Sequence, residues 1–208
     1  MNPLVTWLDR LSGLISLPAA WGIFAAGAVI YLISAWRVRF LALVVQYVFV
    51  GVLYVRIFDT RPEMALMKVL VGWLISGALL VSARVRSQLT GHSGGKIGRW
   101  ATDLPFRILA LITATAIAWL TTQRFSLPYV SADLGLACLL LVVLALLFFG
   151  TEEEDPGIVG VGVLNLLAAL EIFYLAQDPG LLVSGLMVVV SLLVGLVSSY
   201  LTVTEASQ

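Results

Sequence analysis

A carboxyl side chain inside an otherwise apolar segment is the most chemically informative feature of the sequence. Glu171 lies in the run VGVLNLLAALEIFYLAQ, six residues before its end at Gln177. A charge held in hydrocarbon costs about 2.5–3.5 kcal/mol on insertion scales, so this group must hold a proton or meet a polar neighbour within the protein. Glu171 is therefore either a proton-relay residue facing the protein interior or a structural glutamate that ties helices together.

Lys68 is the matching base, in the apolar segment PEMALMKVLVGWL. Its long aliphatic stem can carry the ammonium to the membrane surface, which is the simpler interpretation. The alternative pairs Lys68 with Glu171 at similar depth, which would lower the cost of both charges. In that case Lys68 is the second proton-relay candidate.

Three uncharged polar residues, Gln46, Tyr47 and Asn165, lie in the middle of apolar segments. Each is predicted to make a hydrogen bond between helices, and a polar conduit is the alternative. Asn165 precedes Glu171 by six residues, so the two side chains should point in different directions from one helix.

Other kinds of chemistry find little support in the sequence. His92 is the single histidine and lies in a loop rich in glycine and serine, and Cys138 is the single cysteine. A zinc site needs several such ligands, so no metal or cofactor is predicted. Nucleophile-elbow, phosphate-loop and dinucleotide motifs are absent from the sequence, so the chain is not expected to be an enzyme.

The composition requires lipid as the solvent of this chain. Of its 208 residues, 61% are hydrophobic and only 12% are charged, against about 25% charged residues in soluble domains. A net charge of zero also argues against nucleic acid as a partner. We therefore predict an all-α integral membrane protein whose first partner is the lipid bilayer.

Apolar runs of about 20 residues, long enough to cross a bilayer, alternate with clusters of Arg, Asp, Gly and Pro. They predict a polytopic bundle of about seven transmembrane helices, with residues 1–15 along the membrane interface. The predicted helices are 16–36, 39–57, 62–83, 104–122, 132–150, 156–177 and 180–203.

Acidic residues mark several predicted helix starts. Asp155 with Pro156 and Asp178 with Pro179 each place a carboxylate before a proline. The carboxylate can accept from free backbone N–H groups, and proline lacks the donor that would be left without a partner. Both pairs are predicted to open helices.

The longest polar stretch, residues 84–103, divides the chain. It separates an N-terminal three-helix membrane segment (1–90), through a cytoplasmic loop (91–103), from a C-terminal four-helix segment (104–208). No clear repeat relates the two halves, so an inverted-repeat transporter is not supported.

Basic residues of short loops predict the orientation, since they favour the cytoplasmic side. This bias predicts a multi-pass protein of a prokaryotic cytoplasmic (inner) membrane, with the N-terminus outside and the C-terminus in the cytoplasm. The predicted cytoplasmic set is Arg37, Arg39, Arg84, Arg86, Lys96 and Arg99, against Arg10, Arg56, Arg61 and Arg124 on the other side.

Small residues recur every four positions on two predicted helices: Gly72 and Ser76 on one, and Ser191, Gly195 and Ser199 on the other. Such ladders let helix backbones approach closely. They predict either packing within the bundle or a docking face for another membrane subunit.

The stretch LNLLAALEIFYLA, residues 164–176, resembles the second helix of the K-type subunit of respiratory complex I. The same three-helix module occurs in the C-type subunit of multisubunit cation/proton antiporters. The resemblance implies that Glu171 corresponds to the family's intramembrane proton-transfer glutamate, and that partners are antiporter-like or complex I-like membrane subunits. The family usually has a second glutamate on a neighbouring helix, and 132–150 and 180–203 contain none.

Three functions remain open at this point. The leading hypothesis is a non-catalytic membrane subunit of a larger ion-translocating or redox-linked complex. The second is a small transporter or channel that works alone. The third is a structural or assembly protein that holds its neighbours through small-residue faces.

Overall fold

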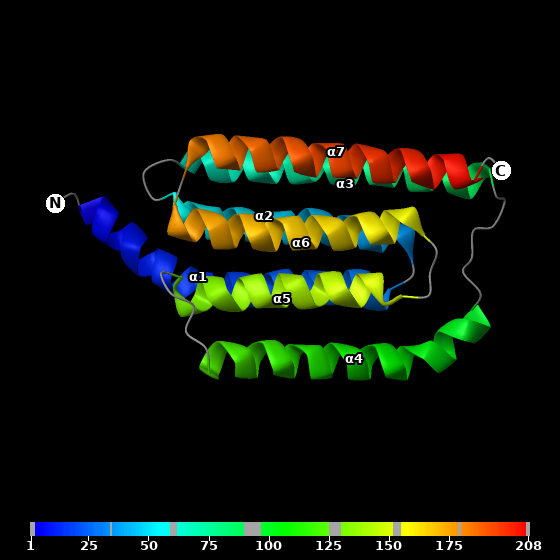
Figure 1. The fold of residues 1–208 in the computed structure, drawn as a ribbon, viewed down its shortest axis with the longest axis horizontal. Coiled ribbons are helices and arrows are strands. Elements are labelled where there is room, and N and C mark those ends of the chain that lie inside the picture. Colours follow the sequence, from blue (N-terminus) through cyan, green and yellow to red (C-terminus); the bar gives the residue numbers. More distant parts are fainter. Residues whose placement is uncertain are drawn as a thin grey trace.

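The structure is a computed structural model built of helices (Figure 1). It describes residues 3–33, 35–58, 62–89, 97–124, 130–151, 155–178 and 180–206, and their side chains except 3–16, 62, 89, 97–103 and 206. Within these ranges the elements are α1 (Pro3–Leu32), α2 (Trp36–Ile57), α3 (Pro62–Leu89), α4 (Ile97–Arg124), α5 (Ala132–Phe149), α6 (Pro156–Gln177) and α7 (Leu181–Ala206).

Six of these helices, α2 to α7, contain segments long and apolar enough to cross a membrane. The apolar part of α1 that could be assessed, Leu17–Leu32, is shorter than a full span, although the helix itself begins at Pro3. The prediction of an all-α polytopic membrane bundle is confirmed. The interface segment predicted at 1–15 is largely a continuation of α1, and the side chains of residues 3–16 lie outside the described part.

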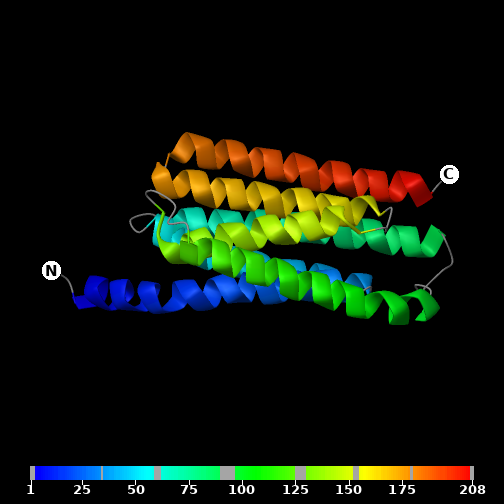
Figure 2. The same ribbon diagram turned by 60° about the horizontal axis from the view of Figure 1, so that its bottom comes forward.

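The helices form two layers of three, with α4 beside them. In one layer α2 lies between α1 and α3, and in the other α6 lies between α5 and α7. The layers face each other through α1 against α5, α2 against α6 and α3 against α7, and α4 packs along α5 (Figures 1 and 2). Because α4 returns the chain across the bundle, each facing pair runs in the same direction.

The apolar core lies between these layers. One cluster of buried side chains joins α1, α2, α5 and α6 around Ile23, Leu53 and Leu141, and a second continues it along the bundle around Leu43 and Leu144. By contrast, the described side chains of α4, from residue 104 on, include only two buried ones, Leu111 and Ala118. The helices α6, α5 and α2 therefore offer the most protected positions among those described.

Two close helix crossings explain the small-residue ladders. A Cβ atom on Gly72 would lie 2.1 Å from Cγ of Tyr47, and one on Gly195 would lie 2.7 Å from Cγ2 of Ile75. Ser76 is buried and donates to the Gly72 carbonyl, 2.7 Å away. Both ladders therefore lie in packing contacts of α3 with its neighbours α2 and α7.

The remaining members of the second ladder are buried as well. Ser191 and Ser199 are 2% and 7% exposed on α7. Of the two predictions for these ladders, packing within the bundle is the one that the structure shows. The close approach of α3 and α7 fixes the position of α3, which carries Lys68.

The helix starts agree with the sequence at one of the two acidic pairs. Asp155 precedes α6 and accepts from the backbone N–H of Gly157 at 3.1 Å, as predicted. The prediction for Asp178 is wrong, because α7 begins only at Leu181 and Asp178 instead ends α6. In addition, α4 begins at Ile97, within the range predicted as the loop 91–103.

Candidate functional site

Lys68 of α3 and Glu171 of α6 form an ion pair inside the bundle. Lys68 Nζ contacts Glu171 Oε2, and the two side chains are 1% and 0% exposed. The simpler interpretation, in which Lys68 reaches the membrane surface, is wrong, since the ammonium points into the protein. The alternative, pairing with Glu171, is confirmed, whereas a proton-relay role for the pair stays a prediction.

The position of Lys68 on α3 explains why it points inward. The helix buries one stripe at intervals of three or four residues, which is the spacing of a single helix face. The residues of this stripe are Ala65, Lys68, Val71, Gly72, Ile75, Ser76 and Leu79. Because Lys68 lies on the same stripe as the packing residues, its side chain enters the space between α2, α6 and α7.

Tyr54 of α2 completes the surroundings of the pair. Lys68 Nζ lies 5.7 Å from the centroid of the Tyr54 ring, within the range of a cation–π interaction. The Tyr54 hydroxyl is close enough to interact with the Glu171 carboxylate. Neither that hydroxyl nor Glu171 Oε1 makes a hydrogen bond of acceptable geometry. Among the described residues, neither oxygen has another hydrogen-bond partner.

Tyr54 was missed by the sequence analysis. A tyrosine in an apolar run carries no charge, and nothing in its neighbours distinguishes it from a packing residue. Its spacing gives the one available signal, since Tyr54 follows Tyr47 by seven residues and so lies on nearly the same face of the helix.

Gln46 of α2 and Asn165 of α6 make a second polar contact. Gln46 Nε2 donates to Asn165 Oδ1 at 2.5 Å, and Asn165 Nδ2 donates to the Val161 carbonyl at 2.9 Å. The interhelical hydrogen bond predicted for these residues is confirmed. The other amide oxygen, Gln46 Oε1, is buried without a partner.

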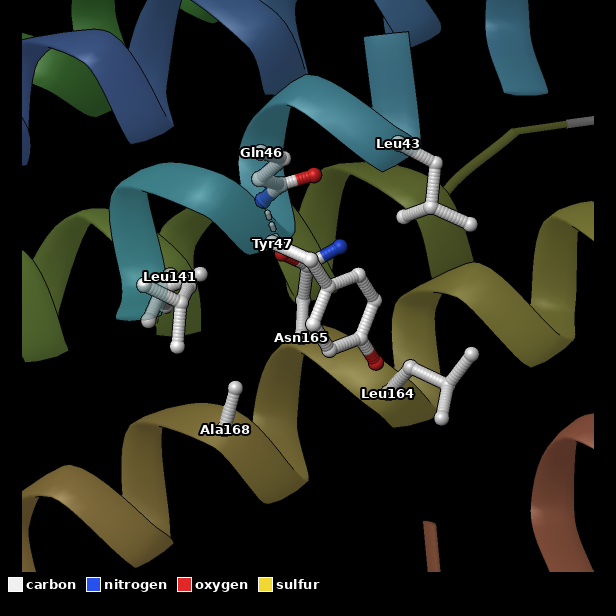
Figure 3. Close-up of a pocket in the computed structure, with 8 residues that line it drawn as sticks. Leu43, Gln46, Tyr47, Leu141, Leu164, Asn165 and Ala168 are labelled. Carbon is white, nitrogen blue, oxygen red and sulfur yellow. Dashed lines mark hydrogen bonds between the residues drawn. The ribbon is translucent and has the colours of Figure 1, made fainter. Parts of the chain in front are cut away.

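A small cavity adjoins this contact between α2, α5 and α6 (Figure 3). Its volume is about 10 Å³, and its polar lining consists of Gln46, Tyr47 and Asn165. The apolar lining is Leu43, Val50, Leu141, Leu164 and Ala168. The cavity is far smaller than the roughly 300 Å³ at which ligand pockets begin.

The ion pair and the cavity lie at different depths of the bundle, and Tyr47 is near both. Tyr47 lines the cavity and also lies within electrostatic reach of Glu171. As expected, Asn165 and Glu171 leave α6 in different directions, toward α2 and α3 respectively. Both are buried because α6 has neighbouring helices on several sides. The polar intramembrane residues identified in the sequence therefore form two buried contacts at different depths, Lys68 with Glu171 and Gln46 with Asn165, and Tyr47 lies beside the second.

Further ion pairs among the described residues lie at opposite ends of the bundle. Arg56 contacts Asp133 at 3.0 Å and joins α2 to α5. Arg86 contacts Asp155 at 2.8 Å and Glu205 at 3.7 Å, which joins α3 to α6 and α7. These side chains are 27–45% exposed, so they connect helix ends at the membrane surface.

Groups of histidine, cysteine and carboxylate side chains that could hold a metal ion are absent from the described residues. His92 lies outside them. Comparison with models of known families, with curated proteins and with solved structures gave no match to this chain.

Proposed function

We propose that this membrane-spanning bundle is a non-catalytic subunit of a larger ion-translocating or redox-linked complex, and that Glu171 with Lys68 is its intramembrane proton-relay site. The observation that carries the proposal is the buried contact between these two side chains. The complex belongs to a prokaryotic cytoplasmic membrane, with the N-terminus outside.

Energetics favour a functional interpretation of the pair. Burying two charges costs several kcal/mol per ion, and replacing a buried pair by apolar residues of similar size is often neutral or stabilising. Stability alone therefore gives little reason to keep Lys68 and Glu171 in the centre of a bundle. Ionisable groups inside membranes mark ion pathways and proton relays instead.

The chemistry of the pair suits a relay. When Glu171 takes up a proton, its charge is lost and the Lys68 ammonium loses its partner, so loading one proton changes the electrostatics of the whole site. The free Oε1 atom and the Tyr54 hydroxyl give that proton an acceptor and a neighbour. A proton can therefore be held at Glu171 or displaced from it by a change in the surroundings of Lys68.

The resemblance of residues 164–176 to the K-type subunit helix supports the same role for Glu171. In this proposal Lys68, which lies outside the resembling module, supplies the partner charge on a neighbouring helix. A subunit rather than a whole transporter is favoured because the resembling helix belongs to a subunit of a larger complex.

The test uses native membranes from cells that carry single variants. We expect wild-type chain to purify in mild detergent with other membrane subunits. We expect Glu171→Gln and Lys68→Met to reduce proton translocation by vesicles at least about tenfold, which corresponds to roughly 1.4 kcal/mol on the rate-limiting barrier. Glu63→Gln, which changes an exposed carboxylate in the first turn of α3, is the matched control.

The alternatives give different results in the same experiment. A transporter that works alone would produce proton flux when the purified chain is placed in liposomes. An assembly protein would tolerate Glu171→Gln with unchanged translocation, whereas loss of the whole chain would prevent the other subunits from assembling. Unchanged translocation with Glu171→Gln in a correctly assembled complex overturns the proposed relay.

A further inference from the structure

Tyr54 of α2 is a buried side chain that lies beside both members of the ion pair. It is 0% exposed, and Lys68 Nζ lies 5.7 Å from the centroid of its ring. Its hydroxyl is close enough to interact with the Glu171 carboxylate. Because Lys68 comes from α3 and Glu171 from α6, Tyr54 adds a third helix to the site.

We propose that Tyr54 is the positioning residue of this pair: its ring holds the Lys68 ammonium, its hydroxyl donates a hydrogen bond to the Glu171 carboxylate, and both contacts favour the charged forms. The inference deepens the function proposed above, because it names the residue that controls proton uptake at Glu171. Its link to translocation rests on that function, whereas the positioning itself does not.

The donors and acceptors of the site favour a hydrogen bond from the hydroxyl. Lys68 bonds to Glu171 Oε2, which leaves Oε1 buried without another partner, and the Tyr54 hydroxyl is in the same situation. Leaving a buried polar group without a hydrogen bond is costly. A phenol can donate, and an ionised carboxylate can only accept. A small rotation of either side chain toward the other would therefore satisfy both groups at once.

The ring of Tyr54 is held in place beside Lys68. The ring of Phe58, one turn further along α2, lies 6.1 Å from it, and both residues belong to the apolar cluster that joins α1, α2, α5 and α6. An ammonium within about 6 Å of an aromatic face is attracted to it, and more strongly where water is excluded. The ring therefore contributes a fixed attraction for the Lys68 charge.

Other titratable side chains near the pair are neutral when protonated. Tyr47 of α2 is close enough to interact with the Glu171 charge, and Cys138 of α5 with Tyr54. The first three turns of α7 carry no titratable side chain. Within the described part of the chain, Lys68 therefore supplies the charge beside Glu171, and Tyr54 supplies a hydroxyl within its reach.

The first experiment measures the effect of the hydroxyl. The full chain in lipid vesicles, with ¹³C-labelled glutamate carboxyl groups, is titrated by infrared spectroscopy, and the spectra of Glu171→Gln are subtracted. We expect Tyr54→Phe to raise the proton affinity of Glu171 at least about tenfold, or about 1.4 kcal/mol, since hydrogen bonds to charged groups are worth at least this much. Tyr200→Phe removes a hydroxyl from a side chain 70% exposed on α7 and should change nothing. Equal proton affinities in wild type and Tyr54→Phe overturn the proposal.

The second experiment measures the effect of the ring. Tyr54→Phe keeps the ring and Tyr54→Leu removes it, so a comparison of these two variants isolates its contribution. The chain has two lysines, Lys68 and Lys96, so ¹⁵N spectra with Lys68→Met as reference assign the ammonium signal. We expect the proton affinity of Lys68 to be at least about threefold lower in Tyr54→Leu than in Tyr54→Phe. Equal affinities contradict the role of the ring.

The third experiment connects Tyr54 to translocation. In the vesicle assay we expect Tyr54→Phe to lower proton translocation at least about threefold, because Glu171 then releases its proton less readily, while Tyr200→Phe leaves it unchanged. If Glu171→Gln abolishes translocation and Tyr54→Phe changes neither the spectrum nor the rate, this inference fails alone. If Glu171→Gln has no effect, the relay fails, and the two titrations still decide whether Tyr54 positions the pair.

Discussion

Three ion pairs between described residues use the same chemistry in different surroundings. Lys68 and Glu171 are at most 1% exposed, whereas Arg56 and Asp133 are 30% and 27% exposed at one end of the bundle. Arg86 with Asp155 repeats the exposed arrangement at the other end. Each pair joins helices that are distant in sequence, so connection alone does not distinguish them.

The surroundings decide what each pair can do. Water and salt screen the pairs at the ends, which are worth about 0–1 kcal/mol each. The buried pair cannot exchange its partner for water, so any change of charge at Glu171 or Lys68 must be met within the protein. The pairs at the ends therefore connect helices. At the buried pair, a change in the protonation of Glu171 would alter the electrostatic interactions of the core.

Removing one member of the buried pair should have the largest effect. Glu171→Leu leaves the Lys68 ammonium uncompensated in the core, and Lys68→Met does the same to the carboxylate. Each should lower the free energy of unfolding by about 3–5 kcal/mol. Reversible unfolding in mixed detergent micelles measures this loss. A loss below 1 kcal/mol would mean that the pair behaves like the exposed pairs.

Removing both members together should restore most of that stability. The double variant Lys68→Met with Glu171→Leu leaves no charge in the core, so its stability should return to within about 1 kcal/mol of wild type or exceed it. The same unfolding titration gives the coupling energy of the two sites. Losses that simply add would show that the two residues do not interact. Proton translocation should stay lost in the double variant, because neither site then has an ionisable side chain. Stability would return while the relay does not, which separates the two effects.

Gln46→Leu should have an intermediate effect. It removes the hydrogen bond to Asn165 while keeping a side chain of similar size, and interhelical hydrogen bonds in membranes are worth about 0.6 kcal/mol on average and 1.7 at most. The loss is partly offset because the free Oε1 atom disappears as well. Unfolding in micelles should show a loss near or below 1 kcal/mol, and a larger loss would indicate a role in packing.

Arg56→Gln should have the smallest effect. It removes a half-exposed ion pair, and such pairs contribute about 0.2–1 kcal/mol. Raising the salt concentration should reduce even this contribution in the wild-type chain, because exposed charges are screened. The stability difference between wild type and Lys68→Met should not change with salt. Equal salt dependence at both sites would remove the distinction between buried and exposed pairs.

Much of the fold could be predicted because lipid imposes simple rules. Apolar runs near the length of a bilayer predicted α2, α5, α6 and α7 to within three residues, and Asp155 with Pro156 marked a helix start correctly. The helices α1, α3 and α4 are longer than predicted, because they continue beyond their apolar runs. Errors occurred where local rules compete. Asp178 has the same pattern as Asp155, but the chain first closes α6 and turns before α7 begins.

The candidate site could be predicted only in part. Glu171 and Lys68 were identified because helix ends do not account for their charges. Their contact depends on α3 and α6 lying within reach of each other across the layers, and the two residues are 103 positions apart in sequence. Tyr54 carries no charge to mark it, and the cavity beside Gln46 arises from the packing of three helices. Neither feature has a local sequence signal.

The most direct test of the central claim is the protonation state of Glu171 in the membrane. Infrared spectra of the chain with ¹³C-labelled glutamate carboxyl groups, subtracted from those of Glu171→Gln, isolate the signal of this side chain. We predict an ionised carboxylate in the wild-type chain that becomes a protonated carboxyl in Lys68→Met, because the glutamate then has no cation beside it. A Glu171 signal that is identical in the two chains would contradict the ion pair and the relay built on it.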